Sequence, residues 1–250
     1  MQHLPLLLAA GLLAGAMNAI AGGGSFVTFP AMVFVGLPPV IANASSTVAL
    51  FPGTLASTWA YRRELAHVAG IPFRWMLPVT IAGGFCGALL LLLTPPHLFD
   101  LVIPWLLLLA TLTFAGGAQA GAALRRAVRI GPSTLLAAQF VISLYGGYFG
   151  GAVGLMMLAA WGLLTADLNV KAMGPARTLL VSAANGAAVL LFIASGLVRW
   201  PETLALLAGA VAGGYGGARV ARCLPPALVR ACVLLLTATI TAVFFRRAFW

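Results

Sequence analysis

The stretch GAMNAIAGGGSFVTFPAMVFVGLPPVIANASST, residues Gly15–Thr47, decides the fold class of this chain. It is apolar enough to belong in a lipid bilayer, yet Gly22-Gly23-Gly24, Pro30 and Pro38-Pro39 interrupt it. A continuous helix gains nothing from three consecutive glycines, because they give up backbone order and side-chain packing. Irregular backbone at membrane depth is tolerated where protein buries it or where it lines a watery cavity. The stretch therefore predicts a broken helix inside a membrane.

A second interrupted stretch, YGGYFGGAVGLMMLAAWGLLTADLNVKAMGPAR, occupies Tyr145–Arg177 in the other half of the chain. Interrupted apolar segments that recur in both halves are the usual sequence indication of a transporter's substrate site. The simpler interpretation is that the glycines only let helices pack closely, as small residues do in membranes. The recurrence favours a site at the two breaks.

The composition indicates an all-α, polytopic membrane protein. Hydrophobic residues make up 62% of the chain and charged residues only 7%, against about 25% charged in a soluble domain. No Asp, Glu, Lys or Arg occurs before Arg62, and a bilayer crossing needs about 20 such apolar residues. We therefore expect an inner-membrane, multi-pass protein with essentially no soluble domain.

The net charge of +10 would suggest a nucleic-acid partner in a soluble protein. Here the basic residues lie in short connectors and near span ends, so we interpret them as topology anchors beside anionic lipid. Cys86, Cys223 and Cys232 show neither CxxC spacing nor a His partner. We expect neither a metal site nor a nucleic-acid partner.

Breakers and apolar runs divide the first half into five predicted helical elements. These are Leu4–Ala21, Ser25–Gly36, Pro39–Tyr61, Arg74–Leu93 and His97–Ala118. The second half repeats the first at an offset of 130, since Gly83-Gly84 matches Gly213-Gly214 and Pro95-Pro96 matches Pro225-Pro226. Agreement of breakers at one offset indicates an internal repeat. We divide the chain into repeats at 1–120 and 132–250, joined by a basic connector at 121–131.

Each repeat is one predicted structural unit, with the site at the interface between the two. Arg62, Arg63 and Arg74 flank one connector and Arg125, Arg126 and Arg129 crowd another, which places both in the cytoplasm. The remaining basic residues divide almost evenly between inverted and parallel repeats. We expect inverted halves, on the precedent of repeat-built transporters.

Enzyme chemistry has little support in the sequence. The chain has only four acids, Glu64, Asp100, Asp167 and Glu202, all at predicted span ends or connectors, and His3, His67 and His97 are peripheral too. Hydrolysis or redox chemistry needs a positioned acid–base pair, an activated nucleophile or a metal. We expect neither an enzyme nor a cofactor.

The candidate binding residues are polar groups near the breaks, together with one cation. They are Arg177, Asn18, Gly22, Gly23, Gly24, Ser25, Asn43, Ser46, Thr47 and Asn185. Helix N-termini at Ser25 and after Pro39 would present free N–H groups, which suit an anion. The repeat alignment puts Arg177 about two turns inside a span, where a basic residue indicates function. The alternative is that Arg177 snorkels to the membrane interface from the start of its helix. We assign such an anchoring role to Lys171.

The AGGGS–P–GLPP pattern, the basic Tyr61-Arg62-Arg63 end, the FGGAVG break and the AGGYGGAR run resemble the TauE/SafE (sulfite exporter) family of membrane transporters. The resemblance covers essentially the whole chain. It implies about eight helical spans in two related halves, and transport of sulfur-containing anions or organosulfonates, often outward. It also implies a site role for Asn18 and Gly22–Gly24, and a basic residue at Arg177. The second break lacks the triple glycine of some members.

We therefore expect a carrier for a small anion such as sulfite, thiosulfate or a sulfonate, with export favoured. One alternative is a membrane scaffold or assembly subunit that moves nothing, which predicts dry, packed breaks. Another is a metal-ion or amine carrier, which would need acids or His–Cys clusters at mid-depth. The placement of the four acids argues against that second alternative.

Overall fold

The structure is a computed structural model of the whole chain. It describes residues 3–20, 23–65, 68, 70–127, 131–162, 173–220 and 226–250, and for 19–20, 117–127, 216–220 and 226–230 it describes the backbone alone. Gly22, Asp167 and Lys171 lie outside the described residues. Within these ranges the fold is all-helical, apart from an isolated bridge between Val68 and Ile71.

The described residues form ten helices, five in each half of the chain. They are α1 (Leu4–Ile20), α2 (Ser25–Phe34), α3 (Pro39–Ala60), α4 (Phe73–Leu93), α5 (Pro96–Ala127), α6 (Pro132–Tyr148), α7 (Val153–Trp161), α8 (Gly174–Ala194), α9 (Trp200–Val220) and α10 (Pro226–Phe249). The first four agree with the predicted elements to within two residues. Pro39 and Pro132 begin helices because proline fits the first turn, where its missing N–H is not needed.

Two predicted boundaries were wrong. α5 continues past Ala118 to Ala127 and enters the predicted connector at 121–131, because that segment is rich in alanine, leucine and arginine, which favour helix. α8 begins at Gly174, so Arg177 lies in its first turn and not two turns inside it. Corresponding helices start 127–130 residues apart, except α3 and α8, which start 135 apart. Pro175 sets this late start.

Among the described residues, four helical segments are long and apolar enough to cross a membrane: Phe73–Leu93, Pro96–Gly116, Gly174–Ala194 and Ala231–Phe249. Large apolar side chains also cover the outside of the bundle, among them Leu93, Val141 and Leu235. Such a surface suits lipid and would be unfavourable in water. The fold is therefore that of a multi-pass helical membrane protein.

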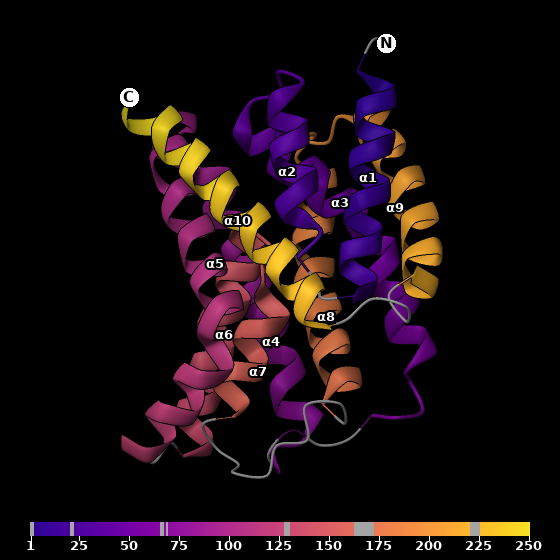
Figure 1. Cartoon of the computed structure of the whole chain (residues 1–250). Coiled ribbons are helices and arrows are strands. Elements are labelled where there is room, and N and C mark those ends of the chain that lie inside the picture. Colours follow the sequence, from indigo (N-terminus) through magenta and orange to yellow (C-terminus); the bar gives the residue numbers. More distant parts are fainter. Residues whose placement is uncertain are drawn as a thin grey trace.

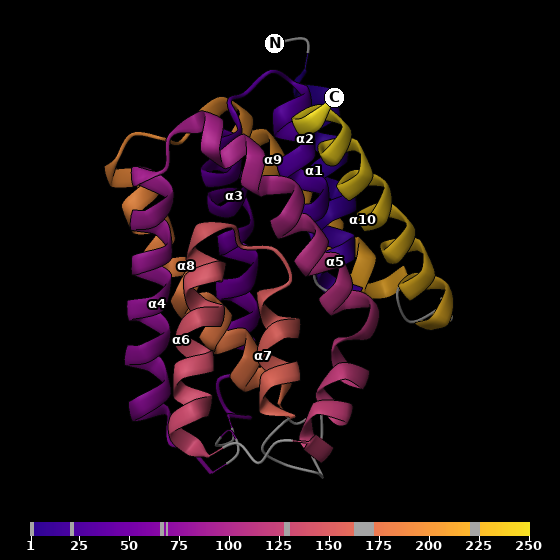
Figure 2. The ribbon, with the colours of Figure 1, turned by 90° about the vertical axis from the view of Figure 1, so that its left-hand side faces the viewer.

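The helices of the two halves interlock. α1 packs along α9, and α4 packs along α6 and α8, so the first helix of each half lies beside the fourth helix of the other (Figures 1 and 2). Glycines permit this closeness: a Cβ at Gly213 would overlap the carbonyl oxygen of Leu12, and one at Gly87 would overlap that of Leu144. Backbone-to-backbone packing of this kind is typical of membrane helices.

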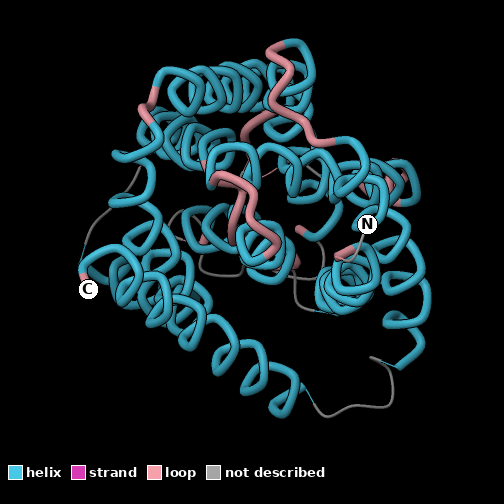
Figure 3. The backbone as a smooth tube through the Cα atoms, turned by 90° about the horizontal axis from the view of Figure 1, so that it is seen from above, coloured by secondary structure: helices cyan, strands magenta, loops and turns pink. Residues whose placement is uncertain are grey.

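α3 and α8 pack on each other and place the breaks of the two halves together. α5 and α10 cross beside them, and Figure 3 shows α10 along one edge of the bundle. In Figure 1 both chain termini lie at the same end of the molecule, and α1 runs from that end towards the middle. In Figure 2 α6 runs towards the middle from the opposite end.

Candidate functional site

Both predicted breaks are non-helical. α1 ends at Ile20, Gly23 has a φ of +91°, and α2 begins at Ser25. In the second half α6 ends at Tyr148, and α7 begins at Val153 after two residues with left-handed backbone, Gly150 (φ +80°) and Ala152 (φ +58°). Ala152 is the one non-glycine residue with positive φ in the described chain, and such a conformation costs about 1–3 kcal/mol. The turn is therefore held in place by its surroundings.

The two breaks meet. A Cβ at Gly150 would lie 3.5 Å from the Thr47 hydroxyl, and one at Gly151 would lie 3.8 Å from the Ser25 hydroxyl. The rings of Phe29 and Phe149 pack edge to face with their centroids 5.6 Å apart. The prediction that the breaks lie together is confirmed for the described residues.

The polar start of α3 is buried and joined to its neighbours. The Asn43 amide donates to the carbonyl of Tyr148 over 2.9 Å, and the hydroxyls of Ser46 and Thr28 lie 2.5 Å apart. Thr47 donates to the Asn43 carbonyl over 2.9 Å. Asn43 and Ser46 therefore position the breaks, while the Thr47 hydroxyl oxygen keeps its lone pairs beside Gly150.

Asn18 stabilises the first break. Its side-chain oxygen accepts a 2.7 Å hydrogen bond from the N–H of Gly24, the residue that precedes α2. A Cβ at Gly24 would lie 2.7 Å from the carbonyl oxygen of Ala14, so a larger residue does not fit there. These residues shape the turn, and Ser25 is the candidate that they bring to the second break.

Arg177 lies against the second break. A Cβ at Gly154 would lie 3.0 Å from the Arg177 Cδ and 3.3 Å from its Cγ, so the aliphatic part of the arginine covers the first turn of α7. Arg177 is partly buried. Among the described residues no carboxylate lies within ion-pair distance of it and no side chain accepts a hydrogen bond from its guanidinium. Its charge is therefore not neutralised by a carboxylate of the described residues, and the Tyr61 side chain interacts with it electrostatically.

Asn185 follows Arg177 on α8 by about two turns, or about 12 Å. Its side-chain oxygen is fully buried and has no hydrogen-bond partner among the described residues. Buried polar atoms are normally paired, so this oxygen is an unused acceptor inside the bundle. The structure shows no direct contact of Asn185 with Ser25 or with Thr47.

Three buried polar side chains that sequence reasoning missed are joined by hydrogen bonds. The Trp161 indole N–H donates to the Gln139 side-chain oxygen over 3.1 Å, and the Gln139 amide donates to the Thr80 hydroxyl over 3.0 Å. The chain joins α7, α6 and α4. The one available signal was Gln139, an amide in an otherwise apolar segment.

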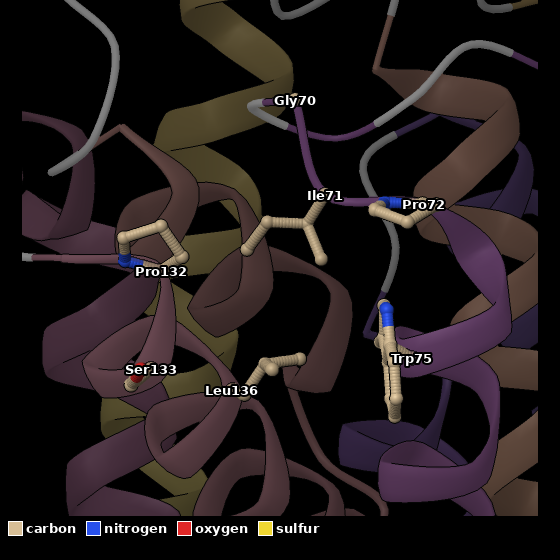
Figure 4. A pocket seen from close by; sticks show the side chains of 7 residues that line it. All are labelled: Gly70, Ile71, Pro72, Trp75, Pro132, Ser133 and Leu136. Atoms are coloured by element: carbon tan, nitrogen blue, oxygen red, sulfur yellow. The ribbon is translucent and has the colours of Figure 1, made fainter.

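A cavity of about 340 Å³ lies elsewhere, between the starts of α4 and α6. Figure 4 shows Trp75 on one side of it and Pro132 and Leu136 on the other, with Ile71 between them. None of the candidate residues lines it. Within the described residues no group of three His, Cys, Asp or Glu side chains could hold a metal ion, so nothing in this part of the chain favours a metal site.

Comparison with known families decides the class of this chain. The sequence profile of the family described as "Sulfite exporter TauE/SafE" matches residues 7–244. The chain belongs to the TauE/SafE family. This confirms the resemblance inferred from the broken motifs.

Curated relatives in the TauE/SafE family carry transporter names. The chain is 28% identical over 240 residues to "Probable membrane transporter protein YfcA" of Escherichia coli K12, covering 96% of this chain and 88% of the relative. It is 29% identical over 245 residues to a "Probable membrane transporter protein" of Haemophilus influenzae, covering 96% and 93%. It is 29% identical over 228 residues to "Probable membrane transporter protein ORF9" of a Sinorhizobium species, covering 87% and 83%. No solved structure is significantly similar to the chain.

Proposed function

We propose that this TauE/SafE protein carries a small sulfur oxyanion or organosulfonate out of the cell across the inner membrane. The observation that carries the proposal is Arg177, whose side chain covers the second break without a carboxylate partner among the described residues. The family description supports the substrate class. The names of the relatives support transport and specify no substrate.

The side chains at the breaks suit a sulfite, thiosulfate or sulfonate group. The guanidinium is a rigid fork of N–H donors that matches two oxygens of such a group, and it stays charged at every physiological pH. Near it, the start of α7 has no side-chain cap, and its N–H groups carry partial positive charge. The Ser25 hydroxyl adds a neutral donor at the other break. One cation with several neutral donors favours a small anion over a metal ion or an amine.

Outward transport follows from the membrane potential. An inside-negative potential favours exit of an anion by about 2.3 kcal/mol per charge per 100 mV. Glu202 has a buried carboxylate oxygen without a partner among the described residues, and it lies in the first turn of α9. The proposal of export therefore rests on the membrane potential.

The two halves, 1–120 and 132–250, are proposed to be inverted repeats. The opposite directions of α1 and α6 in Figures 1 and 2 support this, as does the mutual exchange of fourth helices. About eight membrane-embedded units would result. Six of them are helices that cross fully: α3, α4, α5, α8, α9 and α10. The other two are the pairs α1–α2 and α6–α7, each of which enters the membrane and returns. An odd number of crossings per half is what inverts the second half.

The orientation is proposed to place the α3–α4 connection in the cytoplasm. Arg62, Arg63 and Arg74 are exposed at that end of the bundle, where α5 also ends (Figure 1). Arg246 and Arg247 lie at the end that carries both termini. Connectors richer in arginine stay inside.

Flux measurements on purified protein in liposomes test the proposed function. We expect concentration-dependent efflux of at least one anion among sulfite, thiosulfate and sulfoacetate, and none of ammonium or zinc. Competition by an unlabelled sulfonate but not by chloride would define the anion class. An intact protein that moves none of the three anions would contradict the proposal and favour the scaffold alternative.

A further inference from the structure

The tightest helix contacts in the molecule join helices from different halves. A Cβ at Gly11 would overlap the carbonyl oxygen of Leu206, and one at Gly209 would overlap that of Leu8, so α1 and α9 touch through their backbones. In the same way a Cβ at Gly147 would overlap the carbonyl oxygen of Gly84, which joins α6 to α4. Backbones in contact cannot slide past each other without opening a gap, because no flexible side chain lies between them.

Further bonds fasten α4 to the second half. The buried chain Thr80–Gln139–Trp161 ties it to α6 and α7. A Cβ at Gly84 would lie 2.8 Å from the Ala184 Cα, which brings α8 into the same group. We call α4, α6, α7 and α8 the lower body.

An equivalent group forms around α9. The hydroxyl pair Thr28–Ser46 joins α2 to α3. The main-chain N–H of Arg199, just before α9, donates to the Ser45 hydroxyl over 3.0 Å and joins α3 to α9. We call α1, α2, α3 and α9 the upper body. In Figure 1 α1, α2 and α9 lie towards the end that carries the termini, and in Figure 2 α6 and α7 lie towards the other end.

Contacts between the two bodies are made largely by side chains. The Thr58 and Ser182 hydroxyls are 2.8 Å apart, and a Cβ at Gly186 would lie 3.4 Å from the Phe51 ring. Side-chain contacts of this kind can exchange partners as helices slide, as in shear motions. The breaks lie at this same junction, since Ser25 and Thr47 belong to the upper body and Gly150 and Gly151 to the lower one.

Each direct connection between the bodies contains a glycine in a left-handed conformation. Gly70 (φ +78°) lies between α3 and α4, and Gly196 (φ +71°) lies between α8 and α9. Neither has any atom within 4 Å of a built Cβ. Element-terminal positions with free space are where hinges absorb changes in φ and ψ.

We propose that the moving units of this protein are the upper and lower bodies, each of which holds the fourth helix of the other half, and not the two sequence halves. Given the proposed function, motion at the α3–α8 junction would open the breaks to one side and then to the other.

Four lipid-facing positions distinguish the two possibilities. Leu12 on α1, Leu93 on α4, Val141 on α6 and Leu204 on α9 are all exposed. Leu12 and Leu93 share a sequence half but lie in different bodies, as do Val141 and Leu204. Leu12 and Leu204 share the upper body but lie in different halves, and Leu93 and Val141 share the lower body.

The experiment is pulsed electron–electron double resonance on pairs of spin labels at these four positions in lipid nanodiscs, with and without sulfite. The native cysteines are first replaced (C86S, C223S, C232S). We expect narrow, unchanged distances for Leu12–Leu204 and Leu93–Val141. For Leu12–Leu93 and Val141–Leu204 we expect broader distributions, or shifts larger than the width of the first two.

The reverse pattern, or four unchanged narrow distances in both conditions, would overturn the proposal. Flux of the same labelled proteins in liposomes is measured separately. Normal flux together with the reverse or unchanged distance pattern would contradict the two moving bodies but not transport. The expected distance pattern without flux of any tested anion would contradict transport but not the two bodies.

Discussion

The side-chain amide of Asn43 donates a 2.9 Å hydrogen bond to the main-chain carbonyl of Tyr148, the last residue of α6. The last carbonyls of a helix have no partner within it, and Asn43, buried to 2% exposure, supplies one across the junction between the halves. Asn43, which the sequence analysis selected as a substrate ligand, thus caps the C-terminal end of α6, the helix before the second break.

Replacing Asn43 by leucine should lower stability. The buried Tyr148 carbonyl would lose its donor, at a cost of about 1–3 kcal/mol. Thermal unfolding in detergent, followed by size-exclusion chromatography, measures this. An unchanged midpoint in Asn43→Leu would show that the bond contributes little.

Asn185→Leu is the matched counterpart. Its side-chain oxygen has no partner, so removing it should leave the unfolding midpoint unchanged or raise it. Anion flux should fall, because the N–H donors of the side-chain amide, the groups that could bind an anion, are lost. A fall in stability together with unchanged flux would show that Asn185 is a packing residue and not a ligand.

Gly87→Ala should disturb the pairing of α4 with α6. The added methyl would overlap the carbonyl oxygen of Leu144, and overpacking of this kind costs about 1–3 kcal/mol. Gly53→Ala is the control, since nothing lies within 4 Å of that position in α3. Comparison of the two unfolding midpoints tests the prediction, and equal midpoints would refute close backbone packing at Gly87.

A disulfide between Thr58→Cys and Ser182→Cys should stop transport. The two hydroxyls are 2.8 Å apart, a separation compatible with disulfide geometry. The oxidised protein should lose most of its flux and regain it on reduction, while each single variant keeps it. Full flux in the oxidised form would mean that the α3–α8 junction does not move.

Labelling in intact cells tests the orientation. In the background without native cysteines, Leu65→Cys in the α3–α4 connection should resist an impermeant thiol reagent. Ser195→Cys, exposed after α8, should react. The opposite result would invert the proposed topology.

The sequence predicted the helices whose ends are marked by glycine or proline. Gly23-Gly24, Pro38-Pro39 and the glycines after Tyr148 mark helix ends through backbone constraints that act locally. The start of α8 was missed because the repeat alignment assumed a constant offset, whereas α8 begins at Gly174, with Pro175 in its first turn, later than the repeat implies.

Contacts between distant segments were beyond sequence reasoning. Whether α4 and α9 pack on their own half or on the other half depends on which backbones their glycines contact. Gly83 of α4 and Gly213 of α9 occupy equivalent positions in the two repeats, so the sequence does not show which helix each one contacts. The pairing of Asn43 with a main-chain carbonyl also carries no sequence signal, because every residue has such a carbonyl.

Arg177 decides the central proposal, since among the described residues it is the charged side chain that contacts the second break. Flux of sulfite, thiosulfate and sulfoacetate should be compared in liposomes for wild type, Arg177→Lys, Arg177→Gln and the exposed control Arg246→Gln, with folded yield measured alongside. Arg177→Lys keeps the charge but loses the fork of donors, so it should transport with weakened affinity. Arg177→Gln should fold, yet lose nearly all flux, while Arg246→Gln transports as wild type does. Wild-type flux in Arg177→Gln would place the side chain at the lipid interface and contradict the account.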